Sequence, residues 1–121
     1  MALSVLIVDD SEVFLREAPI LLEREGVSTV GVASTMAQAH RRVEQLSPDV
    51  VLVDIRLAGE SGFELARRLL EHDHCGAAVI LISTHSREDF ADLIAESPAA
   101  GFLAKSELSG QAIRGILGAE G

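Results

Sequence analysis

Short apolar runs recur along the chain, and each is followed by polar residues and then by a stretch of helical period. Strands covered on both faces of a sheet are apolar at almost every position, whereas an apolar repeat near 3.6 residues indicates an amphipathic helix. The alternation predicts five βα units joined by right-handed crossovers. The predicted strands are 3–8, 27–33, 50–54, 77–83 and 100–104.

A predicted helix follows each strand, with its apolar residues on one face and, for three of them, a hydroxyl residue at its start. These caps are Ser11, Ser34 or Thr35, and Ser86, and the last three helices cover about 63–70, 87–96 and 107–117. The first helix runs to about Glu25, and its inner face is formed by Phe14, Ala18, Leu21 and Leu22. The second helix ends before Ser47-Pro48, and its inner face is formed by Ala39, Val43 and Leu46. Pro19 removes one backbone donor, so we expect a kink or a local break in the first helix.

This pattern predicts an α/β fold, a doubly wound, flavodoxin-like parallel sheet of five strands in the order 2-1-3-4-5. The whole chain, residues 1–121, is expected to form one domain, since its length is near the commonest domain size. An apolar fraction of 48% excludes a disordered chain.

Charge and composition narrow the function. A net charge of −9 argues against nucleic-acid binding by this chain alone, because phosphate contacts need lysine and arginine. No apolar run approaches the roughly 20 residues that span a bilayer, and the start does not resemble a signal peptide. The single cysteine, Cys75, excludes an internal disulfide and suits the cytoplasm, where we expect the protein to act.

Polar residues end four of the five predicted strands. Asp9 and Asp10 follow the first, Asp54 ends the third, Ser83 ends the fourth and Lys105 follows the fifth. Open α/β sheets bind ligands at this edge. Three carboxylates there would repel one another by roughly 4 kcal/mol per pair at a near-surface dielectric. A cation is therefore expected, and one oxygen-ligated divalent ion meets the need.

These five residues, at strand ends and in this order, resemble the receiver domain of bacterial two-component response regulators, over essentially the whole chain. The segment 53–57, followed by Gly59 and Gly62, looks like the phosphorylation segment of that family. The stretch 101–106 looks most like receivers of the NarL/LuxR type, which precede a helix-turn-helix DNA-binding domain.

The resemblance implies a phosphorylation-dependent signalling switch. Asp54 would be the phosphoacceptor, attacking a phosphohistidine on a histidine kinase or phosphotransfer protein. Asp9, Asp10 and Asp54, with the backbone carbonyl of Arg56, would hold Mg²⁺, or Mn²⁺ in its place. Lys105 would pair with a phosphoryl oxygen. The domain would catalyse only its own phosphorylation and dephosphorylation and would not otherwise be an enzyme.

The same resemblance implies how the signal leaves the site. The Ser83 hydroxyl would move to a phosphoryl oxygen, and Phe102 would turn inward as the aromatic switch residue. The surface of the fourth helix, fifth strand and fifth helix would then change. It would control a partner, a phosphorylation-dependent homodimer or an output domain, with transcription as the expected output. DNA would be contacted only through a further domain after Gly121, and no membrane partner is expected.

The chain departs from the family pattern at a few positions. Ala58 replaces a frequent proline. Ser106 replaces the proline that often follows the lysine, so no cis bond need form there. Thr84 stands where alanine or glycine is common in the family, so its larger side chain would narrow access to the phosphoacceptor. Arg56 and His85, both bulky, occupy positions that tune dephosphorylation in the family.

Other interpretations remain open. Asp9 and Asp10 alone could be ordinary helix caps. A haloacid-dehalogenase-type phosphatase would need a second aspartate at position 56 and a cap domain, and a flavodoxin-like FMN carrier would not place two carboxylates at its phosphate loop. A pseudo-receiver, an interaction module that is not phosphorylated in the cell, is the more serious rival. The four histidines are interpreted as solvated side chains rather than metal ligands, and Cys75 as an incidental thiol; the histidines are His40, His72, His74 and His85.

Overall fold

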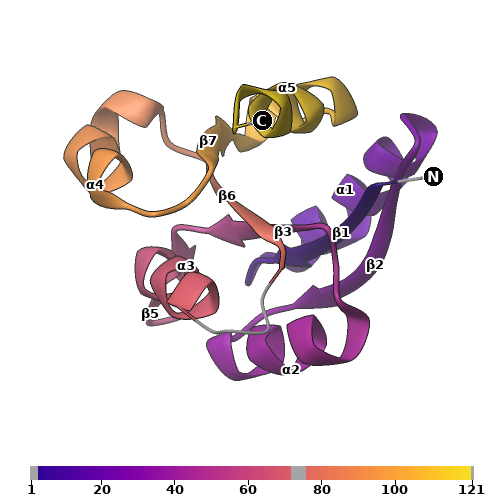
Figure 1. The fold of residues 1–121 in the computed structure, drawn as a ribbon, viewed down its shortest axis with the longest axis horizontal. Coiled ribbons are helices and arrows are strands. Elements are labelled where there is room, and N and C mark those ends of the chain that lie inside the picture. The colour runs from indigo at the N-terminus through magenta and orange to yellow at the C-terminus, as the bar shows by residue number, and fades with distance from the viewer. Residues whose placement is uncertain (1–2, 72–75, 121) are drawn as a thin grey trace.

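Five parallel strands form one sheet in the order β2-β1-β3-β6-β7 in the computed structural model, which describes residues 3–71 and 76–120 (Figure 1). The strands are β1 (Leu3–Val8), β2 (Val27–Ala33), β3 (Val50–Asp54), β6 (Ala78–Ser83) and β7 (Gly101–Ala104). Numbered among themselves, they follow the predicted order 2-1-3-4-5. A small antiparallel pair follows β3, formed by β4 (Arg56–Leu57) and β5 (Glu60–Ser61).

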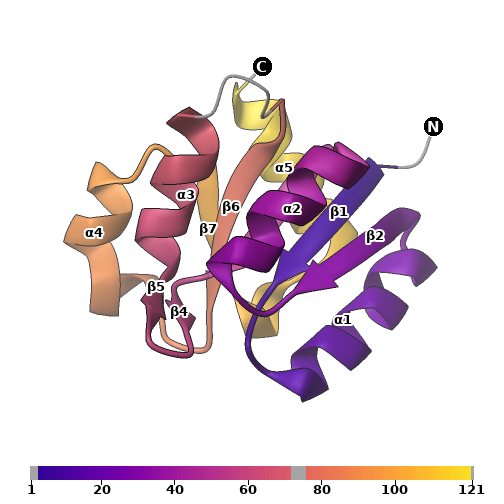
Figure 2. The ribbon, with the colours of Figure 1, turned by 90° about the horizontal axis from the view of Figure 1, so that it is seen from below.

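Helices cover both faces of the sheet. They are α1 (Glu12–Arg24), α2 (Met36–Leu46), α3 (Gly62–Glu71), α4 (Ala91–Glu96) and α5 (Gly110–Glu120). Because successive strand residues point to opposite faces, Val5 and Ile7 pack with α1 and α5 while Leu6 and Val8 pack with α2 and α3. Figure 2 shows α2 and α3 in front of the sheet and α5 behind it. The doubly wound architecture is confirmed.

The first two helices agree with prediction except at single positions. Helix α1 begins after Ser11, whose hydroxyl accepts from the Phe14 N–H, and it continues through Pro19. Of the two expected outcomes, the local break is wrong, because one missing backbone bond does not end a helix whose Ala18 and Leu22 are buried in the core. The kink stays a prediction. Leu21 is exposed rather than inward.

Leu46 of α2 is also exposed, contrary to prediction. The end of α2 lies over Gly31 of the edge strand β2, which has no side chain to complete a pocket. An added Cβ at Gly31 would lie 2.8 Å from a methyl group of Leu46. The leucine therefore touches the sheet but remains partly open to solvent.

The two C-terminal helices start later than predicted. Residues 87–90 after Ser86 form a 3₁₀ turn, and only Ala91–Glu96 are α-helical. A second 3₁₀ turn covers 105–107, and α5 begins beyond Ser109. The Ser109 hydroxyl accepts from the Ala112 N–H, and the Glu25 carboxylate at the end of α1 accepts from the Gly110 N–H. This tertiary contact, invisible in the sequence, sets the start of α5.

Gly62 brings α3 against the end of β3. A Cβ added there would lie 1.9 Å from the backbone oxygen of Asp54, so only glycine permits this approach. The Gly62 N–H donates to the Ile55 carbonyl at 3.0 Å. The glycine thus fixes the backbone that carries Asp54.

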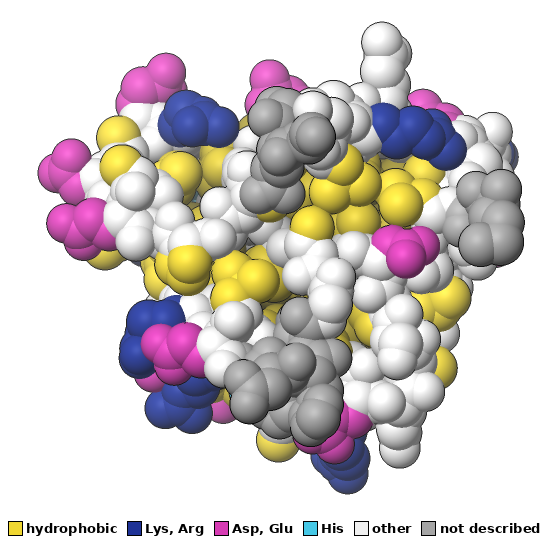
Figure 3. Space-filling view, viewed as in Figure 1, with side chains coloured by type: hydrophobic (Ala, Val, Ile, Leu, Met, Phe, Trp, Pro, Cys, Tyr) yellow, Lys and Arg dark blue, Asp and Glu magenta, His cyan; other side chains and the backbone are white. Residues whose placement is uncertain are grey.

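The strands share one polar end. In Figure 2 the chain leaves β1 for α1 at the same end of the sheet as the β4–β5 hairpin. Figure 3 views the molecule from the opposite end, where acidic side chains are scattered rather than gathered. None of the described helices combines the length and apolar composition required to cross a bilayer. His72, His74 and Cys75 lie outside the described residues.

Candidate functional site

Four charged side chains meet at the carboxyl end of the sheet. Asp9 follows β1 directly, and its N–H donates to the Ala33 carbonyl of β2 at 2.9 Å. Asp54 is the last residue of β3. The Lys105 ammonium reaches both, with Nζ 2.6 Å from Asp9 Oδ2 and 3.2 Å from Asp54 Oδ2. Since Lys105 lies 51 positions from Asp54, the fold alone assembles this group.

A backbone N–H orients each of the three carboxylates. The Ser11 N–H donates to Asp9 Oδ1 at 2.9 Å. The Ala58 N–H donates to Asp10 Oδ2 at 2.9 Å, and the Arg56 N–H donates to Asp54 Oδ1 at 3.1 Å. Asp9, Asp10 and Asp54 can each offer one oxygen such that all three atoms lie within 4.8 Å of one another. The carboxylates therefore converge on one point with their orientation set in advance.

Burial makes the electrostatics of this cluster strong. Asp9 is fully buried and Asp54 is 8% exposed, whereas Asp10 is exposed. Burial, followed by the charge of Asp9, raises the pKa of Asp54 despite the Arg56 N–H and Lys105. Burial alone would lower the pKa of Lys105, but its close contact with the Asp9 carboxylate and the charge of Asp54 raise that pKa. The lysine is therefore a cation at neutral pH, and the carboxylates outnumber it.

The donor set fits a small divalent cation. Asp9 Oδ2 is buried and accepts no well-directed hydrogen bond, although the Lys105 ammonium lies close by. Such an oxygen is left with unsatisfied acceptor capacity, which a cation would use. Three carboxylates with hard oxygen atoms and a solvent-facing side at Asp10 suit Mg²⁺, which keeps several of its waters. The backbone carbonyl of Arg56 as a further ligand stays a prediction.

The predicted switch residues lie beside this cluster. Ser83 ends β6, the neighbour of β3, and its buried hydroxyl accepts from the His85 N–H at 3.0 Å. Phe102 of β7 is 5% exposed, and the Arg87 guanidinium lies 5.7 Å from its ring centroid. Phe102 is therefore already nearly buried in this structure, and any change of its rotamer on phosphorylation stays a prediction.

The three predicted tuning residues are exposed, and the backbones of Arg56 and His85 border the site through their bonds to Asp54 and Ser83. Thr84 lines an open cavity of about 500 Å³ that also includes Phe14 and Lys105. Arg56 and His85 both contact the ring of Phe90, at 5.8 Å and 5.7 Å from its centroid. All peptide bonds of the described residues are trans, including the one before Ser106.

Two residues near the site were missed by sequence reasoning. Phe14 was predicted only as core, yet the Lys105 ammonium lies 4.6 Å from its ring centroid. Phe90 was not singled out, because no periodic pattern marks it. One signal was available: the chain has four phenylalanines and no tyrosine or tryptophan. With only four aromatic rings in the chain, each is a candidate for a specific contact. Phe63 contacts Phe90.

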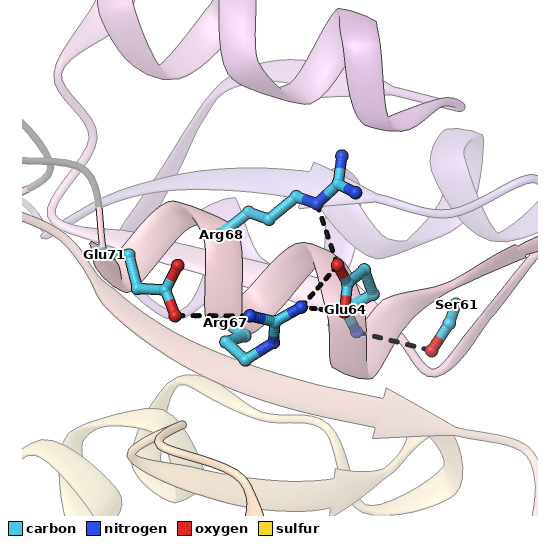
Figure 4. A network of polar contacts seen from close by, with 5 residues as sticks. All are labelled: Ser61, Glu64, Arg67, Arg68 and Glu71. Carbon is cyan, nitrogen blue, oxygen red and sulfur yellow. Dashed lines mark hydrogen bonds and ion pairs between the residues drawn. The ribbon is translucent and has the colours of Figure 1, made fainter.

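A second group of charged side chains lies on α3, and its carboxylates do not converge on one point as those of the site do. Arg67 lies between Glu64 and Glu71, Arg68 also pairs with Glu64, and Ser61 accepts from the Glu64 N–H (Figure 4). The hydrogen bond with Arg67 lowers the pKa of Glu64. All these side chains are one-third exposed or more. They form a solvated helix face with paired charges.

Comparison with known proteins agrees with this geometry. The family model described as the response regulator receiver domain matches residues 5–115. The response regulator GacA of Pseudomonas aeruginosa is 30% identical over 118 residues, which are 94% of this chain and 55% of that protein. The DNA-binding transcriptional activator EvgA of Escherichia coli K12 is 25% identical over 105 residues, 87% of this chain and 51% of that protein.

Solved structures agree as well. A LuxR-family response regulator from Aurantimonas has a TM-score of 0.85 at 28% identity, covering 98% of this chain and 87% of that one. The receiver domain of the response regulator NarL from Mycobacterium tuberculosis has a TM-score of 0.82 at 27% identity, covering 98% and 95%. The chain spans about half the length of the curated relatives named here.

Proposed function

Because the chain belongs to the response regulator receiver domain family, we propose that it is a signalling switch that accepts a phosphoryl group on Asp54. The donor would be a phosphohistidine on a histidine kinase or phosphotransfer protein. One observation carries the proposal: a single ammonium, that of Lys105, lies within 3.2 Å of both the Asp54 and the Asp9 carboxylates at the ligand-binding edge of the sheet.

Asp54 is the nucleophile in this proposal. One of its oxygens attacks the phosphorus in line, the P–N bond to the histidine breaks, and its electrons remain on the imidazole, which takes a proton from solvent. The Arg56 N–H, at 3.1 Å from Oδ1, fixes the carboxylate plane during the attack. Phosphoryl transfer depends on positioning and charge neutralisation more than on covalent assistance.

Asp9, Asp10 and Asp54 would hold the Mg²⁺ or Mn²⁺ ion. When bound, the ion supplies positive charge against the phosphoryl oxygens and the crowded carboxylates. Lys105 contributes from the protein: once Asp54 carries the acyl phosphate, the Lys105 ammonium can pair with a phosphoryl oxygen. Such a charge-assisted bond is worth about 1.5–3 kcal/mol.

Ser83 and Phe102 would carry the change outward. The Ser83 hydroxyl, which now accepts from the His85 N–H, would turn to donate to a phosphoryl oxygen. Loss of that contact frees the loop after β6, which leads to Arg87 and its position over the Phe102 ring. The surface of α4, β7 and α5 would then favour self-association. The test is sedimentation: Ser83→Ala and Phe102→Ala should both weaken phosphate-dependent association, and parent-like behaviour of both would contradict this route.

The proposed output is transcription. Two relatives named above are a response regulator and a DNA-binding transcriptional activator, and this chain matches about half of each. DNA contact would come through a further domain of the natural protein, since a net charge of −9 argues against DNA binding by this chain alone. The proposed compartment is the cytoplasm, which the single cysteine suits.

Phosphorylation by a small donor tests the proposal. Incubation with acetyl phosphate and Mg²⁺ should raise the intact mass by one phosphoryl group, and EDTA should prevent the rise. Asp54→Asn should abolish it. Asp92→Asn, which removes an exposed carboxylate on α4, is the matched control and should be labelled like the parent. Equal labelling of the parent and Asp54→Asn would refute Asp54 as the acceptor.

A further inference from the structure

The ring of Phe90 lies between side chains from three different parts of the fold. The Arg56 guanidinium carbon is 5.8 Å from its centroid, and the His85 ring meets it edge-on at 5.7 Å and 88°. The Phe63 ring of α3 packs against it at 6.4 Å. Arg56 comes from β4 and His85 from the loop after β6, so Phe90 joins the segments that follow β3 and β6.

Both exposed partners are tied to the phosphoacceptor site through their backbones. The Arg56 N–H donates to Asp54 Oδ1, and the His85 N–H donates to Ser83 Oγ. Arg56 and His85 therefore contact Phe90 with their side chains and the site with their backbones. Their N–H groups bond to Asp54 and Ser83, the two residues predicted to contact the phosphoryl group. The ring is connected to the site along two independent paths.

Phe90 itself is anchored. It is half-buried and packs against the core cluster that includes α3, together with Phe63. Phe90 is the last residue of the 3₁₀ turn of 87–90 and, at φ −132° and ψ 24°, the N-cap of α4. Its neighbours on this segment are mostly exposed, as Leu93 is at 50%. A fixed ring among exposed residues can restrain the long side chain of Arg56 and the imidazole of His85.

We propose that Phe90 is a positioning residue that prolongs the phosphorylated state by holding Arg56 and His85 at the mouth of the site. The inference rests on the proposed phosphorylation of Asp54. In dephosphorylation a water oxygen attacks phosphorus, and the P–O bond to Asp54 breaks. The Asp54 carboxylate is the leaving group, and the water gives a proton to solvent. The water must approach opposite the Asp54 oxygen. Side chains restrained by Phe90 narrow that approach.

The test measures loss of phosphate from phosphorylated protein after removal of acetyl phosphate. Phe90→Leu keeps apolar bulk but removes the ring, and it should speed the loss by about tenfold, the effect of a 1.4 kcal/mol change in barrier. Phe90→Tyr keeps the ring and should decay like the parent. Leu93→Ala, an exposed position on the same segment, is the matched control and should also decay like the parent.

A double-mutant cycle separates positioning from packing. If Phe90 acts through its two partners, Phe90→Leu should change nothing further in a chain that already carries Arg56→Ala and His85→Ala. The His85 ring-proton chemical shifts provide a second readout, because they should move in Phe90→Leu and stay in Phe90→Tyr even without phosphorylation.

Three results would overturn the inference: parent-like decay of Phe90→Leu, equally fast decay of Phe90→Tyr, or an undiminished effect of Phe90→Leu in the Arg56→Ala, His85→Ala background. Each of these results is compatible with phosphorylation of Asp54. A parent chain that takes up no phosphoryl group overturns the proposed function itself, and the inference with it.

Discussion

Asp54→Asn should make the protein more stable at neutral pH in the absence of divalent ions. Asparagine retains an oxygen for the Arg56 N–H, so the change removes mainly a charge. That charge is nearly buried and shares the site with Asp9 and Asp10. The structure therefore predicts that the phosphoacceptor costs stability in the folded state.

The magnitude follows from the distances. The three carboxylate oxygens lie within 4.8 Å of one another. At an effective dielectric of about 20, a separation equal to this limit gives a repulsion of about 3.5 kcal/mol per pair. Lys105, at 3.2 Å, attracts Asp54 by about 5 kcal/mol on the same basis. Repulsion from two neighbours exceeds this attraction by about 2 kcal/mol, less the screening at exposed Asp10. Burial acts in the same direction as repulsion, so we expect a gain of about 1–2 kcal/mol.

Thermal unfolding in EDTA measures this gain. For a domain of this size it corresponds to a rise in Tm of roughly 3–10 °C. The pKa of Asp54 is raised in the folded state, so its ionisation opposes folding above that pKa and ceases to do so below the ordinary aspartate pKa. The difference in Tm should therefore be largest near pH 7 and shrink as the pH falls. Glu12→Gln, an exposed carboxylate, controls for net charge. A lower Tm for Asp54→Asn than for the parent at pH 7 would refute the reasoning.

Three further predictions concern the metal, a backbone contact and the lifetime of the phosphoryl group. Mg²⁺ at one hundred times its Kd should stabilise the parent by about 2.7 kcal/mol in thermal unfolding, and Asp10→Asn at the same concentration should gain less; no response of the parent would contradict the metal site. Gly62→Ala should unfold the protein or lower its Tm sharply, because its Cβ would meet the Asp54 carbonyl, whereas Gly115→Ala in open space within α5 should not lower it. Arg56→Ala and His85→Ala should each speed phosphate loss, by about tenfold if 1.4 kcal/mol of barrier is removed; slower loss in His85→Ala would instead indicate that the imidazole orients the attacking water.

The strands and their ends could be predicted from the sequence because burial on both faces leaves a nearly unbroken apolar run that stops where solvent begins. Asp54 and Ser83 end their strands at the predicted residues. The convergence of Asp9, Asp54 and Lys105 also followed, since parallel strands deliver their ends to one edge of a sheet.

Contacts between elements could not be predicted in the same way. Leu46 packs over Gly31 of another element, and Glu25 of α1 accepts from the Gly110 N–H at the start of α5. Phe90 takes its place from partners in three segments, so no local pattern marks it. Helical periodicity identifies the inward face of a helix but not how much of that face its neighbours cover.

The position of the phosphoryl group tests the central claim most directly. After phosphorylation by acetyl phosphate in Mg²⁺, borohydride reduces an aspartyl phosphate to homoserine, which peptide mass spectrometry can locate. We expect homoserine in place of aspartate at position 54, and no homoserine when EDTA is present during the incubation with acetyl phosphate. Reduction at Asp9, at Asp10 or at any other carboxylate instead of Asp54 would contradict it.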